Sequence, residues 1–142
     1  MAEPELHWLG VADAAKMIRA GDVSPVEIVE DTLRWIEITE PIVHNYVTLL
    51  ADQALADAKA AGKAIRSGDD LGPFHGITFT VKDVIAVGGV PMKCNSELTK
   101  DFVPKEDSFV VKKMRAAGAV CLGKVATHEF SWGVTCQPAR NP

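Results

Sequence analysis

The sequence predicts a mixed α/β fold in which helices cover a small, partly parallel sheet. The run 77–81 is rich in β-branched and aromatic side chains, which is typical of a buried strand. A helical pattern follows, capped by Asp107 or Ser108 and extending to Ala117, and a second apolar run covers 119–122. This strand–helix–strand order favours two parallel strands joined by a right-handed crossover.

Two amphipathic helices are predicted near the start of the chain. Apolar residues recur at helical spacing over 11–20. The second helix begins with a capping box, in which Ser24 is the N-cap, a proline follows it, and Glu27 stands three residues after the cap. We expect this helix to end near residue 39, because Pro41 cannot continue it.

The middle of the chain contains an extended segment and a third helix. Residues 45–50 indicate a strand, and the alanine-rich stretch 51–66 indicates a helix. We therefore divide the chain into an N-terminal helical region, 1–70, and an α/β region, 71–142. The last twelve residues are irregular and loop-like, so we expect the chain to end within a loop.

Composition excludes several classes of protein. The chain has 142 residues, which suits one domain, with 47% hydrophobic and 24% charged residues. Its net charge of −4, with no basic cluster, argues against a nucleic-acid partner. No apolar run is long enough to span a membrane, and the acidic start at 1–5 does not resemble a signal peptide. We expect neither a nucleic-acid nor a membrane partner.

The cysteines argue against metal or redox chemistry. Cys94, Cys121 and Cys136 are widely spaced and show no zinc-binding or redox motif. We expect three thiols in a reducing cytoplasm, no metal and no cofactor. A cysteine hydrolase pair formed by Cys94 or Cys136 with His128 has no support in the surrounding sequence.

Lys82, directly after the run 77–81, is the candidate catalytic residue. It is either solvated or paired with Asp83, or it is held in an apolar site where the neutral amine acts as a base. Strand alternation places Lys82 on the face of Thr80, and Asp83 on the opposite face with Val81. The adjacent carboxylate is therefore not the natural ion-pair partner of Lys82.

Other polar residues near the predicted sheet have simpler interpretations. Lys124 follows the second strand and shares with Lys82 the sheet edge where ligands gather, but a solvated strand end is the commoner case. His75 precedes a glycine in a turn and is expected to shape the loop. His128 and Glu129 are adjacent and would point apart on a helix, which gives a metal role little support.

Taken together, several stretches resemble the amidase signature family. Their order and spacing are more specific than any one of them, and they cover nearly the whole chain. They are Val23–Glu27, Glu40-Pro41, Asn45–Val47, Gly72–Ile77, Val81-Lys82-Asp83, Pro104–Asp107, Arg115–Val120, Leu122–Lys124 and Glu129-Phe130.

The resemblance implies a large central mixed sheet flanked by helices. It also implies hydrolysis of a carboxamide bond in a small-molecule substrate by a Ser–cis-Ser–Lys triad, without a cofactor, and Lys82 in the Val-Lys-Asp motif matches the triad lysine. A serine hydroxyl is a weak nucleophile until a base takes its proton. A lysine does this only when neutral, so its ordinary pKa of about 10.4 must fall by several units.

The two triad serines have no counterpart in this chain. The family's Gly/Ser-rich stretch, which supplies the relay serine, would follow Pro142, and the nucleophilic serine would lie further on. Three serines of the second half match neither role: Ser96, Ser108 and Ser131. The resemblance thus implies that 71–142 is the start of the amidase core, ending before the Gly/Ser-rich stretch. We expect this chain alone to be inactive.

Two alternatives remain open, and one physical expectation follows. The chain could be a non-catalytic truncated assembly or interaction module, or part of the amidase subunit of a tRNA-dependent amidotransferase. Departures from the family pattern at Asn95 and at 125–128 leave the substrate open. A partial sheet would expose an unpaired edge, so we expect self-association.

Overall fold

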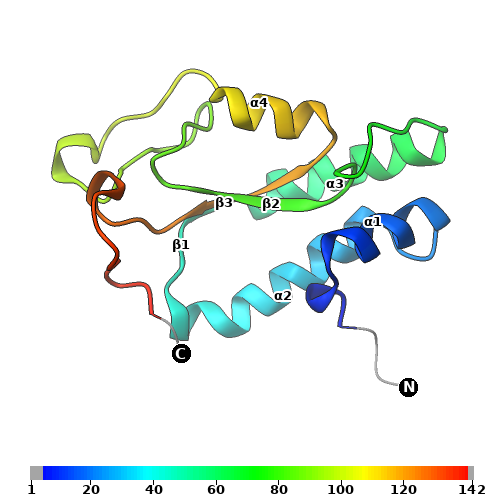
Figure 1. The fold of residues 1–142 in the computed structure, drawn as a ribbon, viewed down its shortest axis with the longest axis horizontal. Coiled ribbons are helices and arrows are strands. Elements are labelled where there is room, and N and C mark those ends of the chain that lie inside the picture. The colour runs from blue at the N-terminus through cyan, green and yellow to red at the C-terminus, as the bar shows by residue number, and fades with distance from the viewer. Residues whose placement is uncertain (1–4, 141–142) are drawn as a thin grey trace.

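The computed structural model describes residues 5–140 and shows helices packed around a three-stranded sheet (Figure 1). Most of the acidic start, residues 1–4, and the last two residues lie outside the described part. In chain order the elements are η1 (Leu6–Trp8), α1 (Val11–Ala20), α2 (Pro25–Val43), β1 (Tyr46–Leu49), α3 (Ala51–Arg66), β2 (Thr78–Lys82), η2 (Glu97–Thr99), α4 (Phe109–Ala116), β3 (Val120–Val125) and η3 (Glu129–Ser131), where η denotes a 3-10 helix.

The sheet is mixed, with the strand order β1-β3-β2. β2 runs parallel to β3, as the strand–helix–strand pattern predicts, and β1 runs antiparallel to β3. Val125 at the end of β3 pairs with Lys82 on one side and Tyr46 on the other. β1 comes from the predicted region 1–70 and β3 from 71–142, so the two regions share one sheet.

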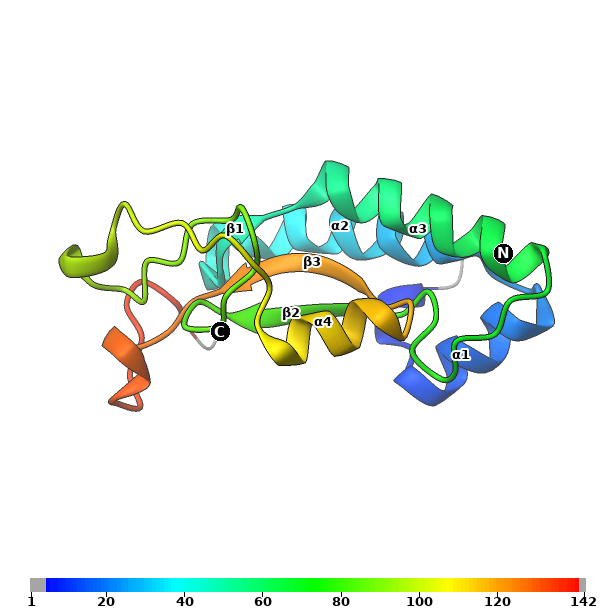
Figure 2. The ribbon, with the colours of Figure 1, turned by 90° about the horizontal axis from the view of Figure 1, so that it is seen from above.

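Helices cover both faces of the sheet. Seen from above, α4 lies over β2, while α2 and α3 lie beside β3 and β1 (Figure 2). Val120 and Leu122 of β3 pack in one core cluster with residues of α2 and α3. Val81 of β2 packs with Val111 of α4 in another. A third cluster joins α1 to the start of α2 and to Ile77.

The N-terminus of α2 forms the predicted capping box. The Ser24 hydroxyl accepts a hydrogen bond from the Glu27 backbone N–H at 3.2 Å, and the Glu27 carboxylate accepts one from the Ser24 backbone N–H at 2.8 Å. The predicted end of this helix was wrong, because α2 continues through Pro41 to Val43. A proline this close to the C-terminus removes one hydrogen bond while the rest of the last turn stays paired.

Two local features complete the picture of the second half of the chain. Val111 of α4 fills the core, whereas the neighbouring Val110 is 48% exposed. The segment 125–130 begins inside β3 and contains the start of the 3-10 helix η3. Pairing on both sides extends β3 to Val125, beyond the predicted end at Leu122.

No helix within residues 5–140 has both the length and the apolar character that crossing a membrane requires.

Candidate functional site at the carboxyl ends of β2 and β3

Side chains alternate between the two faces of β2 up to its last residue. Val81 is 7% exposed and Asp83 is 1% exposed, whereas Thr80 and Lys82 are exposed. This confirms that Lys82 shares a face with Thr80 and that Asp83 points the other way. Within residues 5–140 the Lys82 ammonium makes no ion pair and reaches solvent. The predicted apolar surroundings of this amine are not present in the described chain, and its role as a base stays a prediction.

Asp83 instead pairs with Lys124 at the end of β3. The Lys124 ammonium lies 2.9 Å from Asp83 Oδ1, and both side chains are buried, at 0% and 1% exposure. This contact is an ion pair, and within residues 5–140 no hydrogen bond to Oδ1 accompanies it. The interpretation of Lys124 as a solvated strand end was therefore wrong.

Other polar groups complete the surroundings of this buried pair. Asp83 Oδ2 accepts hydrogen bonds from the backbone N–H groups of Lys93 at 3.1 Å and Cys94 at 3.0 Å. The Lys124 ammonium donates to the carbonyl oxygens of Pro91 at 3.1 Å and Asp83 at 3.4 Å. Burying two charges costs several kcal/mol per ion, and close pairing with further hydrogen bonds offsets that cost.

The pair also fixes the course of the loop that follows β2. Its hydrogen bonds join the ends of both parallel strands to residues 91–94. The loop then turns sharply, because Cys94 and Asn95 both adopt left-handed backbone conformations, with φ of 52° and 53°. Sequence reasoning missed this pair. The sequence carried no signal for it, because the strand register, which shifts between Phe79 and Thr80, is what places both side chains on one face.

A small cavity adjoins the pair, with a volume of about 90 Å³. Its wall contains the Asp83 side chain and residues from the loop after β2, from the segment after β3 and from the end of the described chain. The lining residues are Val47, Asp83, Lys93, Asn95, Ala126, Thr127, Cys136, Gln137 and Pro138. The cavity has room for water molecules beside the buried pair.

His75 has the structural role that the sequence predicts. Its side chain is buried, and its Nδ1 accepts a hydrogen bond from the Leu71 backbone N–H at 3.4 Å. The ring lies against Gly118, where an added Cβ would come within 2.4 Å of His75 Cδ2. His75 thus ties the turn before β2 to the turn between α4 and β3.

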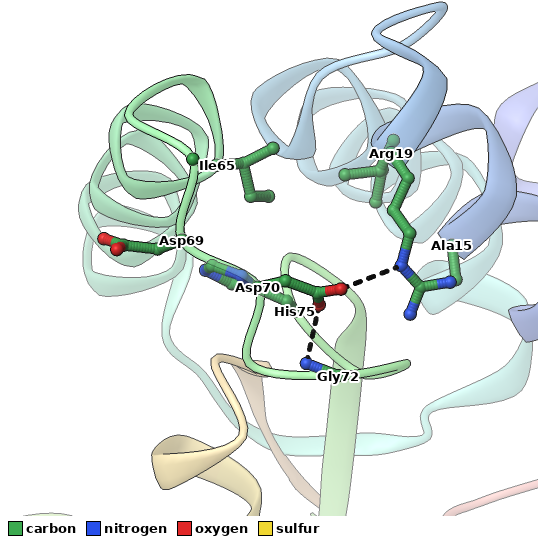
Figure 3. Close-up of a pocket in the computed structure, with 9 residues that line it drawn as sticks. Ala15, Arg19, Ile65, Asp69, Asp70, Gly72 and His75 are labelled. Carbon is green, nitrogen blue, oxygen red and sulfur yellow. Dashed lines mark hydrogen bonds and ion pairs between the residues drawn. The ribbon is translucent and has the colours of Figure 1, made fainter.

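A larger cavity of about 270 Å³ lies between α1, the end of α3 and the turn before β2 (Figure 3). Arg19 of α1 and Asp70 face each other across it, with 3.8 Å between the guanidinium Nε and the carboxylate Oδ2. Asp70 Oδ1 also accepts the Gly72 backbone N–H at 2.8 Å. These contacts hold the loop after α3 against α1, far from the candidate site.

The serines of the second half make local contacts. Ser96 Oγ accepts the Leu98 backbone N–H at 3.4 Å, and Ser131 Oγ lies 3.0 Å from Thr127 Oγ1. Ser108 is the N-cap of α4. Within the described chain none of them contacts Lys82. No group of three or more His, Cys, Asp or Glu side chains in residues 5–140 is arranged to hold a metal ion.

The sequence matches one family model, described as Amidase, over residues 27–142. A similar curated protein is a glutamyl-tRNA(Gln) amidotransferase subunit from Desulfotalea psychrophila, which is 40% identical over 131 residues. That match covers 92% of this chain and 27% of the relative. The chain therefore spans about a quarter of the length of the curated relatives that it matches first.

Solved structures of amidases also share the fold of this chain. The peptide amidase from Stenotrophomonas maltophilia superposes with a TM-score of 0.80 at 29% sequence identity, over 87% of this chain and 26% of the amidase. A bacterial aryl acylamidase of the amidase signature family has a TM-score of 0.80 at 25% identity, over 88% of this chain and 26% of that enzyme. The mixed sheet and its helices are thus a segment of the fold of these enzymes.

Proposed function

This chain belongs to the amidase family, and on that premise we propose that it is the N-terminal part of an amide hydrolase in which Lys82 is the terminal base. The observation that carries the proposal is the position of Lys82 at the carboxyl end of a parallel strand, without an ion-pair partner in residues 5–140. An amine held by a carboxylate stays protonated, whereas an unpaired amine can lose its proton once another segment covers it.

The proposed reaction needs groups beyond this chain. A nucleophilic serine attacks the amide carbon, and its proton passes through a relay serine to the neutral amine of Lys82. The same proton then returns to the leaving nitrogen as the C–N bond breaks, which leaves an acyl-serine ester. A water molecule, deprotonated through the same relay, then hydrolyses this ester, so that the carboxylic acid leaves and the serine regains its proton. Lys82 would supply the base. Because this chain covers only 27% of its relative, we infer that both serines lie outside it. Small carboxamides are the proposed substrate class, and no cofactor takes part.

Two measurements test this proposal. The first is ammonia release from simple primary amides by this chain alone. We expect none, and turnover that Lys82→Ala abolishes would contradict the proposed need for outside serines. The second is the encoding reading frame beyond residue 142. Continuation into a Gly/Ser-rich stretch would support an amidase, and a stop codon there would favour the non-catalytic interaction module.

A second candidate is the amidase subunit of a tRNA-dependent amidotransferase. The 40% identity to a glutamyl-tRNA(Gln) amidotransferase subunit favours it. If the reading frame continues, the encoded protein should be assayed for ammonia release from glutamine and from simple amides. Activity on glutamine alone, with transfer of its ammonia only when partner subunits are added, would favour the amidotransferase. Partner-independent activity on simple amides would favour the free-standing hydrolase.

A further inference from the structure

The Val-Lys-Asp motif places a carboxylate directly after the candidate base. Asp83 is the next residue after Lys82, yet within residues 5–140 its side chain makes all of its charged and polar contacts on the opposite face of β2. A nearby negative charge stabilises the protonated form of an amine even without direct contact. Neutralising Asp83 is therefore one requirement for an easier loss of the Lys82 proton.

Lys124 meets this requirement. Its ammonium lies 2.9 Å from Asp83 Oδ1, and the pair as a whole carries no net charge. Two backbone N–H groups hold the second carboxylate oxygen, so Asp83 has no oxygen left to turn toward Lys82. Lys93 is the other charged residue lining the adjacent cavity, and it contacts Asp83 through its backbone while its side chain is exposed.

Register makes this arrangement specific to one position. Val81 pairs with Lys124 across the parallel strands, and Lys82 pairs with Val125. Lys124 thus shares a face with Val81 and Asp83, and its ammonium lies on the side of the sheet that Lys82 does not occupy. A lysine one residue later would project beside Lys82 and repel it.

We propose that Lys124 is a positioning residue for Lys82: it captures and neutralises the Asp83 carboxylate on the far face of β2, and leaves the Lys82 amine unpaired. This inference rests on the proposed function of Lys82 as a base. It assigns the second lysine of this sheet edge to the control of protonation, not to contact with substrate.

Competitive labelling of lysines tests the proposal on this chain without any substrate. Only neutral amines react with acetic anhydride, so the labelling rate of Lys82 at pH 8, relative to the exposed Lys59 of α3, reports how protonated Lys82 is. Lys124→Met leaves the Asp83 charge unbalanced and should slow the labelling of Lys82 by about twofold or more. Asp83→Asn leaves the positive charge of Lys124 behind and should accelerate the labelling of Lys82 by a similar factor.

The double variant Asp83→Asn/Lys124→Met is the matched control, and its ratio should return close to that of the unchanged chain. Opposite effects of the two single variants are decisive, because general loosening of the fold would move both ratios in the same direction. Labelling ratios that change in the same direction in both single variants, or in neither variant, would overturn the proposal. Circular dichroism checks folding, and if Lys124→Met does not fold, Lys124→Gln, which also removes the charge, takes its place in the comparison with Asp83→Asn. If the labelling experiment contradicts the role of Lys124, the amide-hydrolysis proposal is unaffected, because the ammonia-release assay tests it separately.

Discussion

The Asp31 carboxylate of α2 accepts both the backbone N–H and the imidazole of His7, at 2.8 Å and 2.6 Å, although the two residues are 24 positions apart. The His7 ring also stacks on Trp35, with 4.5 Å between ring centroids. Asp31 Oδ1 binds the Arg34 guanidinium at 2.9 Å. This cluster fastens the short helix η1 to α2.

Acid should weaken this attachment. Burial raises the pKa of Asp31, but hydrogen bonds from Arg34 and His7 outweigh it, and the pKa lies below its usual value of 3.8. A lowered pKa stabilises the fold above the unfolded value of about 3.9, and this contribution disappears as the pH falls through the folded pKa. Asp31→Asn should therefore destabilise the chain at pH 7 and much less at pH 3, measured by urea unfolding. The exposed Glu37→Gln on the same helix is the control; an equal loss at both pH values would contradict the prediction.

Removing one partner of the Asp83–Lys124 pair should lower the free energy of unfolding more than the loss of a favourable contact alone would. Removing one partner leaves a buried, uncompensated charge, so Asp83→Asn or Lys124→Met should each cost about 3–5 kcal/mol. The double variant should cost less than the sum of the two, because it leaves no unpaired charge. Denaturant unfolding of the four proteins gives this coupling directly. Additive losses would show that the two groups do not act as a pair.

Gly123 in β3 should not tolerate a side chain. Its φ of 148° lies outside the usual range of other residues, and an added Cβ would lie 2.2 Å from the Thr48 carbonyl oxygen in β1. Gly123→Ala should cost more than about 2 kcal/mol in thermal or chemical unfolding. Gly89→Ala is the matched control, since its φ is 76° with nothing within 4 Å of the added Cβ. Equal losses would mean that backbone strain alone, without the clash, explains the effect.

Alkaline pH should weaken the fold through Tyr46. Burial, together with Glu40 and Cys121, raises the pKa of Tyr46 to about 12. The neutral phenol is favoured in the folded chain, so this contribution is complete below the unfolded pKa of about 10 and is lost as the pH rises toward 12. Comparing Tyr46→Phe with the unchanged chain between pH 9 and 12 should reveal a difference of about 1 kcal/mol, after allowance for partial exposure. If the unfolding free energies of the two proteins changed in parallel between pH 9 and 12, the prediction would be wrong.

The sheet edge and the exposed apolar side chains should make this chain self-associate. Within residues 5–140, β1 and β2 each pair with β3 on one side only, and Val47 and Leu49 on β1 are 38% and 40% exposed. Light scattering should show a mass that rises with concentration, and Val47→Lys should lower it by placing a charge on the edge. The exposed Val11→Lys on α1, away from the edge, should have little effect. A monodisperse monomer at all concentrations would contradict the expectation.

Local sequence signals predicted the elements whose causes are themselves local. The capping box at Ser24 and the alanine-rich stretch 51–66 each specify their helix through neighbouring residues. Alternation in 78–83 correctly assigned Lys82 and Asp83 to opposite faces. The motif order also indicated the amidase family, which the match over 27–142 confirms.

Only the tertiary structure decided where the charges near the candidate site go. Lys124 looked solvated because nothing nearby in the sequence announces a partner 41 residues away. The parallel register brings it onto the face of Asp83, and burial then makes pairing obligatory because a lone charge there would be too costly. The sequence alone thus predicted Lys82 as the candidate base, and the sheet determined that Lys124, and not Lys82, forms an ion pair within residues 5–140.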